Sequence, residues 1–321
     1  MSFNQHLKLD WRTANKRAIR DGVGEGLLKI GEDERVVVLS GDVAGSTRVH
    51  KFEEIWPNRF FEMGVAEQNM MGVAAGMASE GLTPFVSSYA TFSPGRNWEQ
   101  IRVSVCLSNL NVKIIGGHAG VATGVNGPTH QATEDIALMR VLPHMTVLVP
   151  ADATQCAASI EAAYKHPGPV YIRATRPETP DFTKQIPFEI GKVYKYRDGK
   201  DVTIAACGIQ VWECLMVTEE LAQQGIACEV LNVSTIKPLD RITILESVKK
   251  TGRMMTVEDH QVSGGMGSAI AELLSEKYPV RIKRLGVADR FGVSGDWEDV
   301  YKQVGLDRDT LREAIRRFVL D

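Results

Sequence analysis

Short apolar and β-branched runs alternate with helical patterns of about 10 to 15 residues, and this alternation constrains the fold more than any other feature. The expected strands cover residues 36–40, 84–89, 112–116, 145–149 and 169–173. The expected helices cover residues 66–80, 95–108, 130–141 and 152–165. Strands separated by helices are typical of parallel sheets built from βαβ units, so we expect an α/β domain with a doubly wound sheet.

A second series of strands follows a break in this pattern. Residues 177–200 contain three prolines and end at the turn Asp198-Gly199, a composition typical of a linker. Beyond it we expect strands over 202–207, 227–233, 253–257 and 280–285, and a closing amphipathic helix over 307–320. The sequence therefore predicts two doubly wound α/β domains, over 1–176 and 201–321, of which the second is smaller and carries a mixed or parallel sheet.

Composition and charge exclude several classes of function. The chain has 321 residues, of which 44% are hydrophobic, and this is enough for two full cores. A net charge of −3 and a pI near 6.2 provide no basic field for nucleic acid. The first residues lack an apolar signal core, and no stretch reaches the ~20 apolar residues of a membrane span. We therefore expect a cytoplasmic protein that binds neither nucleic acid nor membranes.

The cysteine pattern argues against disulfides and against metal ligation through sulfur. The five cysteines, at positions 106, 156, 207, 214 and 228, form no Cys-x-x-Cys pair and no paired framework. We expect reduced structural thiols and no metal ligands on this chain.

Glu67 is the most informative single residue. It follows an apolar run and opens a small-residue helical pattern, where an unpaired buried charge costs several kcal/mol. We therefore expect its carboxyl group to accept a hydrogen bond or share a proton. A purely structural glutamate at the positive end of a helix dipole would explain the position alone.

A glycine-rich segment over residues 116–131 is the second informative feature. It follows an expected strand and precedes an expected helix, so His118 and His130 belong to a loop at a carboxyl strand end. Open α/β sheets bind ligands at such ends. The alternative is a flexible loop in which Thr129 caps the following helix.

Several motifs in one order resemble the transketolase family. They are Gly64-Val65-Ala66-Glu67-Gln68, Tyr89-Ala90-Thr91-Phe92 and Gly127-Pro128-Thr129-His130-Gln131. The resemblance is to the carboxyl-terminal half of the family and runs from Arg12 to the last helix. It implies a pyrimidine-binding domain over 1–176 and a transketolase carboxyl-terminal domain over 201–321.

The family's amino-terminal half carries a Gly-Asp-Gly motif, with a downstream asparagine, that holds magnesium and the diphosphate of thiamine diphosphate. Gly41-Asp42-Val43 and Gly295-Asp296-Trp297 lack the second glycine and the asparagine. The chain thus resembles one subunit of a split transketolase. The resemblance implies thiamine diphosphate and Mg²⁺ as cofactors and a separate amino-terminal subunit that mainly holds the metal and the diphosphate. It also implies a heterotetramer with two copies of each subunit.

The resemblance also implies roles for single residues. Glu67 matches the glutamate that hydrogen-bonds the aminopyrimidine ring, and Phe92 matches the aromatic residue that stacks on it, with Tyr89 close by. His118 and His130 match histidines of the substrate channel, where imidazole moves protons.

Three further residues match groups that bind the phosphate of the sugar. These are Arg12, Ser46 and Arg176. Arg12 has the alternative of a solvated surface charge. Arg173, close to Arg176 in the sequence, is a candidate for an internal structural partner.

Asn126 departs from the family pattern, which places an aspartate at this position against a hydroxyl of the ketose donor. Asparagine keeps the size but loses the charge and one acceptor. The sequence therefore leaves the identity of the donor sugar undecided, and branched or sulfonated sugars are alternatives to ordinary ketose phosphates.

Three hypotheses about function remain. The first is a transketolase subunit that moves a two-carbon ketol unit from a ketose phosphate to an aldose phosphate with the help of its partner. The second is a decarboxylating relative, either a 2-oxoacid dehydrogenase β subunit or a deoxyxylulose-phosphate synthase. The third is a regulatory subunit that keeps the fold without chemistry.

Overall fold

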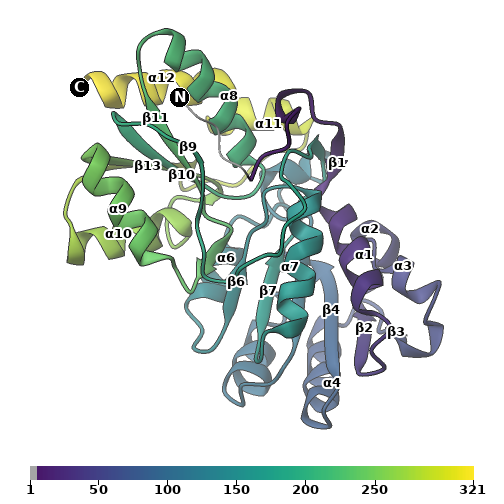
Figure 1. The fold of residues 1–321 in the computed structure, drawn as a ribbon. Helices are drawn as coiled ribbons and strands as arrows, with labels where there is room; N and C mark the ends of the chain where they lie inside the picture. The colour runs from purple at the N-terminus through teal and green to yellow at the C-terminus, as the bar shows by residue number, and fades with distance from the viewer. Residues whose placement is uncertain (1–5) are drawn as a thin grey trace.

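The computed structural model describes residues 6–321 and contains two α/β domains that lie side by side (Figure 1). The first carries a seven-stranded sheet in the order β12-β6-β7-β5-β4-β2-β3, and the second a five-stranded sheet in the order β14-β13-β10-β11-β9. The predicted fold class, with two α/β domains and parallel or mixed sheets, is confirmed.

Strands of the first sheet are short, and all but the edge strand β3 are almost wholly buried. They are β2 (Val36–Ser40), β3 (Phe60–Glu62), β4 (Thr83–Tyr89), β5 (Lys113–Gly117), β6 (Thr146–Leu148) and β7 (Val170–Arg173). These six strands pair in parallel with one another. Alternate side chains belong to two different cores, as in Val36 and Val38 on one face and Val37 and Leu39 on the other. Both faces therefore need a helical layer, which the βαβ connections supply.

Each face of the first sheet has its own helices. On one face α1 (Ile19–Ile30) packs against α7 (Ala153–Lys165), and a Cβ on Gly22 would overlap the Ala153 carbonyl oxygen. The other face is covered by α4 (Glu67–Ser79), by α5 (Trp98–Gln100), which continues as a π-helix over Ile101–Cys106, and by α6 (Asp135–Arg140). Two short helices, α2 (Ala44–Thr47) and α3 (His50–Glu53), follow β2.

The second sheet has a parallel centre and one antiparallel edge. Its strands are β9 (Tyr194–Arg197), β10 (Val202–Ala206), β11 (Cys228–Asn232), β13 (Arg253–Gln261) and β14 (Arg281–Val287), of which β9 is antiparallel to β11. Helices α8 (Gln210–Gln223), α11 (Trp297–Val304) and α12 (Arg308–Leu320) share one core, whereas α9 (Arg241–Thr251) and α10 (Met266–Lys277) belong to the other.

Two short pairings tie the halves of the chain together. Strand β12 (Thr235–Lys237) leaves the second domain and pairs antiparallel with β6, so it forms an edge of the first sheet. Strand β1 (Lys16–Ala18) pairs antiparallel with β8 (Glu178–Pro180). Strands β8 and β9 both lie within the segment 177–200 that the sequence suggests is a linker.

The helix predicted over 130–141 is shorter than expected and begins at Asp135. Residues before it are held by other partners, because the Ala132 carbonyl accepts hydrogen bonds from Gly120 N–H and from the Arg173 guanidinium. Thr129 does not cap this helix, and its hydroxyl lies 2.9 Å from His130 Nδ1 instead. Early residues of the predicted helix therefore extend the loop.

Candidate active site

Four strands of the first sheet bring the candidate residues to one edge. Ser46 follows β2, Tyr89 ends β4, His118 follows β5 and Arg176 follows β7. These strands are neighbours in the order β7-β5-β4-β2 and all run in parallel, so their carboxyl ends lie together. The expectation of a ligand site at the carboxyl strand ends therefore has a geometric basis.

Glu67 is the first residue of α4, and its side chain is buried, with 1% exposed. One carboxylate oxygen accepts a hydrogen bond from the Ser88 hydroxyl at 3.1 Å. The other accepts one from the Arg96 guanidinium at 2.6 Å, and Arg96 itself is 45% exposed. The expected partner of this buried carboxylate thus exists, and it connects the carboxylate to the surface.

An aromatic cluster lies beside Glu67. The rings of Tyr89 and Phe92 have centroids 6.1 Å apart in a stacked arrangement. His130 contacts both rings edge-on, with centroids 5.8 Å and 5.3 Å away, and His118 lies 4.1 Å from Tyr89. Tyr89, Phe92 and His130 are only partly buried, so the cluster presents ring surface to a ligand.

His118 is held in an unusual state. Its backbone has φ of +53°, a conformation that costs of order 1–3 kcal/mol for such a residue and is concentrated at functional sites. Burial, followed by the charges of Arg20 and Arg176, lowers the pKa of His118 to about 3. Nε2 lies 3.4 Å from Arg20 Nη1, and because guanidinium only donates, Nε2 is the acceptor and Nδ1 carries the proton. The ring is therefore neutral at physiological pH.

Arg20 is a site residue that the sequence analysis missed. Besides His118, its guanidinium contacts the Ser46 carbonyl oxygen at 2.9 Å, and its charge interacts with that of Arg176. Arg176 in turn donates to the Thr123 carbonyl oxygen at 3.3 Å. Two arginines therefore face the neutral His118, an arrangement suited to an anionic group on a ligand. The only sequence signal was an arginine in the first turn of α1.

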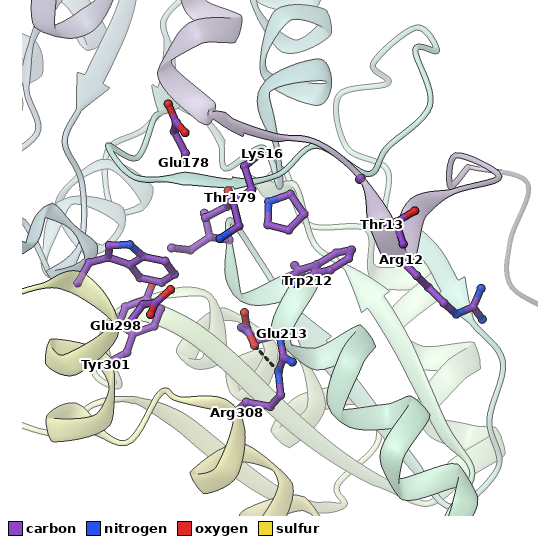
Figure 2. A pocket seen from close by; sticks show the side chains of 14 residues that line it. Arg12, Thr13, Lys16, Glu178, Thr179, Trp212, Glu213, Glu298, Tyr301 and Arg308 are labelled. Atoms are coloured by element: carbon purple, nitrogen blue, oxygen red, sulfur yellow. Dashed lines mark hydrogen bonds and ion pairs between the residues drawn. The ribbon is translucent and has the colours of Figure 1, made fainter.

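Arg12 does not join this cluster. Its guanidinium forms a bidentate contact with Glu219 in α8 and lies over the Trp11 ring. It borders a separate cavity of about 320 Å³ between the β1–β8 pair and helices α8 and α11, and Figure 2 shows its side chain directed away from the centre of that cavity. Of the predicted anion-binding residues, the structure therefore groups Ser46 and Arg176 but not Arg12.

The second domain fixes the glycine-rich loop. The Asp259 carboxylate accepts hydrogen bonds from Val121 N–H at 2.9 Å and Ala122 N–H at 3.3 Å, and from the Tyr301 hydroxyl at 3.0 Å. Gly120 has φ of +82°, and a Cβ there would overlap this carboxylate. The loop continues as a kinked 3₁₀ helix over Val121–Asn126 and leaves Asn126 exposed.

A closed ion pair lies behind the loop. Arg173 donates to Asp135 at 2.8 Å, and both side chains are buried, with 2% and 0% exposed. Arg173 also binds the carbonyl oxygens of Ala132 and Asp259, and the Tyr171 hydroxyl binds Asp135. Arg173 is therefore the internal structural partner suggested by the sequence. His260, also fully buried, accepts from the Ala137 N–H across the domain boundary.

Residues 6–321 contain no group of three or more His, Cys, Asp or Glu side chains arranged to hold a metal ion. All five cysteines are free and buried. Within the same range, none of the helices combines the length and the apolar character needed to cross a membrane.

Comparison with known families decides the relationship. Residues 11–181 match the transketolase pyrimidine-binding domain, and residues 191–311 match the transketolase carboxyl-terminal domain. The chain belongs to the transketolase family. This relationship confirms the resemblance seen in the sequence, and the transketolase family implies dependence on thiamine diphosphate.

Two relatives of similar length are described as transketolase subunits. One is the 6-deoxy-6-sulfo-D-fructose transketolase subunit SqwH of Clostridium sp. (strain MSTE9), 42% identical, with 93% of this chain and 92% of the relative covered. Another is a subunit of the apulose-4-phosphate transketolase of Phocaeicola vulgatus, 36% identical, with 95% and 98% covered. A solved split-gene transketolase, described as an inactive beta4 tetramer, is 43% identical, with a TM-score of 0.85 and coverage of 94% and 97%. This chain is therefore a transketolase-type subunit.

Proposed function

We propose that the chain is the carboxyl-terminal subunit of a split transketolase that transfers a two-carbon ketol unit from a ketose donor to an aldose phosphate acceptor. The observation that carries the proposal is the convergence of a buried carboxylate, an aromatic cluster and two facing arginines at one sheet edge. These groups are Glu67, Phe92, Tyr89, His118, His130, Arg20 and Arg176.

The residues fit the aminopyrimidine half of thiamine diphosphate. Glu67 is buried but reached from the surface beside the half-exposed Arg96, and Phe92 presents a partly buried ring next to it. Glu67 would hydrogen-bond the pyrimidine nitrogen, and Phe92, with Tyr89 behind it, would stack on the ring. When bound, thiamine diphosphate supplies a nucleophilic carbon and an electron sink for breaking a carbon–carbon bond.

We assign Mg²⁺ and the diphosphate to a partner subunit. The sequence contains no Gly-Asp-Gly motif with a downstream asparagine, and in the proposed split enzyme this motif belongs to the second subunit. A cofactor shared between two different chains makes each chain incomplete alone, and a heterotetramer with two copies of each subunit satisfies both sites. The description of the solved relative as an inactive beta4 tetramer supports a requirement for the second subunit.

The neutral His118 and the arginines near it indicate which residues would contact the sugar substrate. As a neutral imidazole, His118 can hydrogen-bond the donor without bringing a charge into the site, and the partly buried His130 is placed to exchange protons with hydroxyls. Arg176, together with Ser46 and Arg20, would hold the anionic end of the sugar. Arg12 would have to leave Glu219 to take part.

Asn126 bears on the choice of donor. It is exposed on the loop beside the site. Its amide can donate or accept a hydrogen bond, whereas a carboxylate at this position could only accept one from a hydroxyl of the donor sugar. Two relatives are described as acting on a sulfonated sugar and on apulose 4-phosphate. We therefore propose that the donor range extends beyond ordinary ketose phosphates to sulfonated or branched sugars.

The test mixes the chain with its candidate diphosphate-binding subunit, thiamine diphosphate and Mg²⁺, and follows ketol transfer to ribose 5-phosphate. Xylulose 5-phosphate and 6-deoxy-6-sulfofructose serve as alternative donors, and a Glu67→Gln sample is the control. Turnover that needs both chains and is lost in the control supports the proposal. Full activity of this chain alone, or activity that survives Glu67→Gln, would refute it. Native mass spectrometry of the mixture tests the two-plus-two assembly.

A further inference from the structure

Arg96 occupies an unusual position at the cofactor site. Its guanidinium donates to one Glu67 carboxylate oxygen at 2.6 Å, and its central carbon lies 4.7 Å from the centroid of the Phe92 ring. Glu67 and Phe92 are the two residues that the proposed function gives to the aminopyrimidine ring. A single side chain of this subunit therefore makes both contacts.

The chemistry of the two groups is similar. Guanidinium is planar, stacks on aromatic faces and presents N–H donors in the plane to a carboxylate. An aminopyrimidine is also planar, and it too would stack on Phe92 and place nitrogen against Glu67. The guanidinium now occupies the face of Phe92 and the Glu67 oxygen that the aminopyrimidine ring would use. Each can bind only one planar group at a time, so Arg96 in its present position and the bound ring exclude each other.

The side chain of Arg96 can change its rotamer while the residues around it stay in place. Its main chain is fixed, since its N–H donates to the Phe92 carbonyl oxygen and its own carbonyl oxygen accepts from the Gln68 side chain. Asn97 next to it bonds the Glu67 carbonyl oxygen at 3.2 Å. The side chain, by contrast, is 45% exposed and has several rotatable bonds, so the guanidinium can turn into solvent while Glu67 and Phe92 stay in place.

We propose that Arg96 gates the cofactor site: its guanidinium competes with the aminopyrimidine ring for Glu67 and Phe92, and thiamine diphosphate binds only when Arg96 has turned outward. This inference rests on the proposed function. It gives the residue a positioning role rather than a chemical one. The gate lowers the apparent affinity by the fraction of molecules in which Arg96 points outward.

The test measures binding of thiamine diphosphate to the complex of this chain with its diphosphate-binding partner and Mg²⁺, by calorimetry. If the outward state is about one tenth of the population, Arg96→Ala binds about tenfold more tightly than the wild type. Arg96→Lys keeps the charge but lacks the planar fork, so it should bind with an intermediate affinity. Arg102→Ala, an exposed arginine on the following π-helix, is the matched control and should bind as the wild type does.

Inorganic diphosphate provides a second readout, because it probes the partner's half of the site alone. Its affinity should be the same in all four complexes. A wild-type complex that does not bind thiamine diphosphate would overturn the proposed function and this inference together. Normal wild-type binding, with unchanged or weaker binding by both Arg96 variants, would overturn the role of Arg96 alone.

Discussion

Asp135 and Glu67 are buried carboxylates of the first domain that are each paired with an arginine, and the two pairs differ in what surrounds them. Asp135 and Arg173 are both buried and are joined by further bonds to Tyr171 and to two carbonyl oxygens. Glu67 is equally buried, but Arg96 is half exposed, and within residues 6–321 the Ser88 hydroxyl is the one other donor to this carboxylate. We call these the closed pair and the open pair.

The difference distinguishes an ion pair that stabilises the fold from one that belongs to a ligand site. A closed pair with satisfied partners holds the chain together, and removing one member leaves a charge stranded in the interior. An open pair can exchange its arginine for another donor, which is what a ligand site requires. The predictions below test that division, beginning with the largest expected effect.

Arg173→Ala should lower the free energy of unfolding by about 3–5 kcal/mol, because Asp135 would keep a buried charge without its cation. Arg96→Ala should cost about 1 kcal/mol or less, since water can replace the half-exposed guanidinium. Urea unfolding followed by circular dichroism measures both. Equal costs for the two variants would remove the distinction between the pairs.

Glu67→Gln should reduce kcat by at least about a hundredfold in the complete enzyme, because an amide cannot share a proton with the pyrimidine nitrogen. Its stability should stay within about 1 kcal/mol of the wild type, since the amide oxygen can accept from Arg96 while the amide NH2 donates to the Ser88 hydroxyl oxygen. Steady-state kinetics and urea unfolding on the same preparation separate the two effects. A stable variant with wild-type kcat would contradict the assignment.

The neutral His118 of the candidate site makes the stability of the chain sensitive to acid. Its pKa is about 3 in the folded chain, because of burial and the nearby Arg20 and Arg176, against 6.5 for the free side chain. Between these values the unfolded chain binds more protons, so the free energy of unfolding falls as the pH drops below 6.5. The loss is about 2 kcal/mol at pH 5.

His118→Asn removes this titration, and asparagine tolerates the positive φ better than most residues. Urea midpoints measured from pH 7 to pH 5 should therefore fall less steeply for the variant than for the wild type. Parallel profiles would show that the pKa of His118 in the folded chain lies near its unfolded value of 6.5.

Tyr301→Phe tests the smaller contribution of one hydrogen bond between the second domain and the glycine-rich loop. It removes the bond from the Tyr301 hydroxyl to Asp259 and leaves the bonds from the two loop amides in place. We expect a loss of about 1 kcal/mol and faster hydrogen exchange at Val121 and Ala122. Tyr278→Phe, on a partly buried ring of the same domain, is the control. Unchanged exchange at both amides would mean that Tyr301 does not help to hold the loop.

Much of the fold was predictable because local patterns determine it. The β-branched run at 36–40 and the small-residue helix from Glu67 have strong periodicity, and the structure places them within a residue or two of the expected bounds. The helix expected from residue 130 begins later, at Asp135, because long-range hydrogen bonds to Ala132 outweigh its local helical pattern.

The candidate site was predictable to the extent that it follows strand ends. His118, Ser46 and Tyr89 could be placed at one edge once the strands were known, since parallel strands share that edge. Arg20 could not, because its direction depends on α1 and on the β1–β8 pairing. The contact of Arg12 with Glu219 joins residues far apart in the sequence, and neither residue type signals it.

Strand β12 has a consequence for how the protein is made. Residues 235–237 are synthesised after all of β10 and β11, yet they cover the edge of β6 in the first sheet. During synthesis the first domain therefore emerges from the ribosome with one edge unpaired and is completed only when the second half arrives. A truncated chain that ends at the linker would leave the β6 edge of the sheet unpaired. Such a chain would be prone to aggregate through this edge.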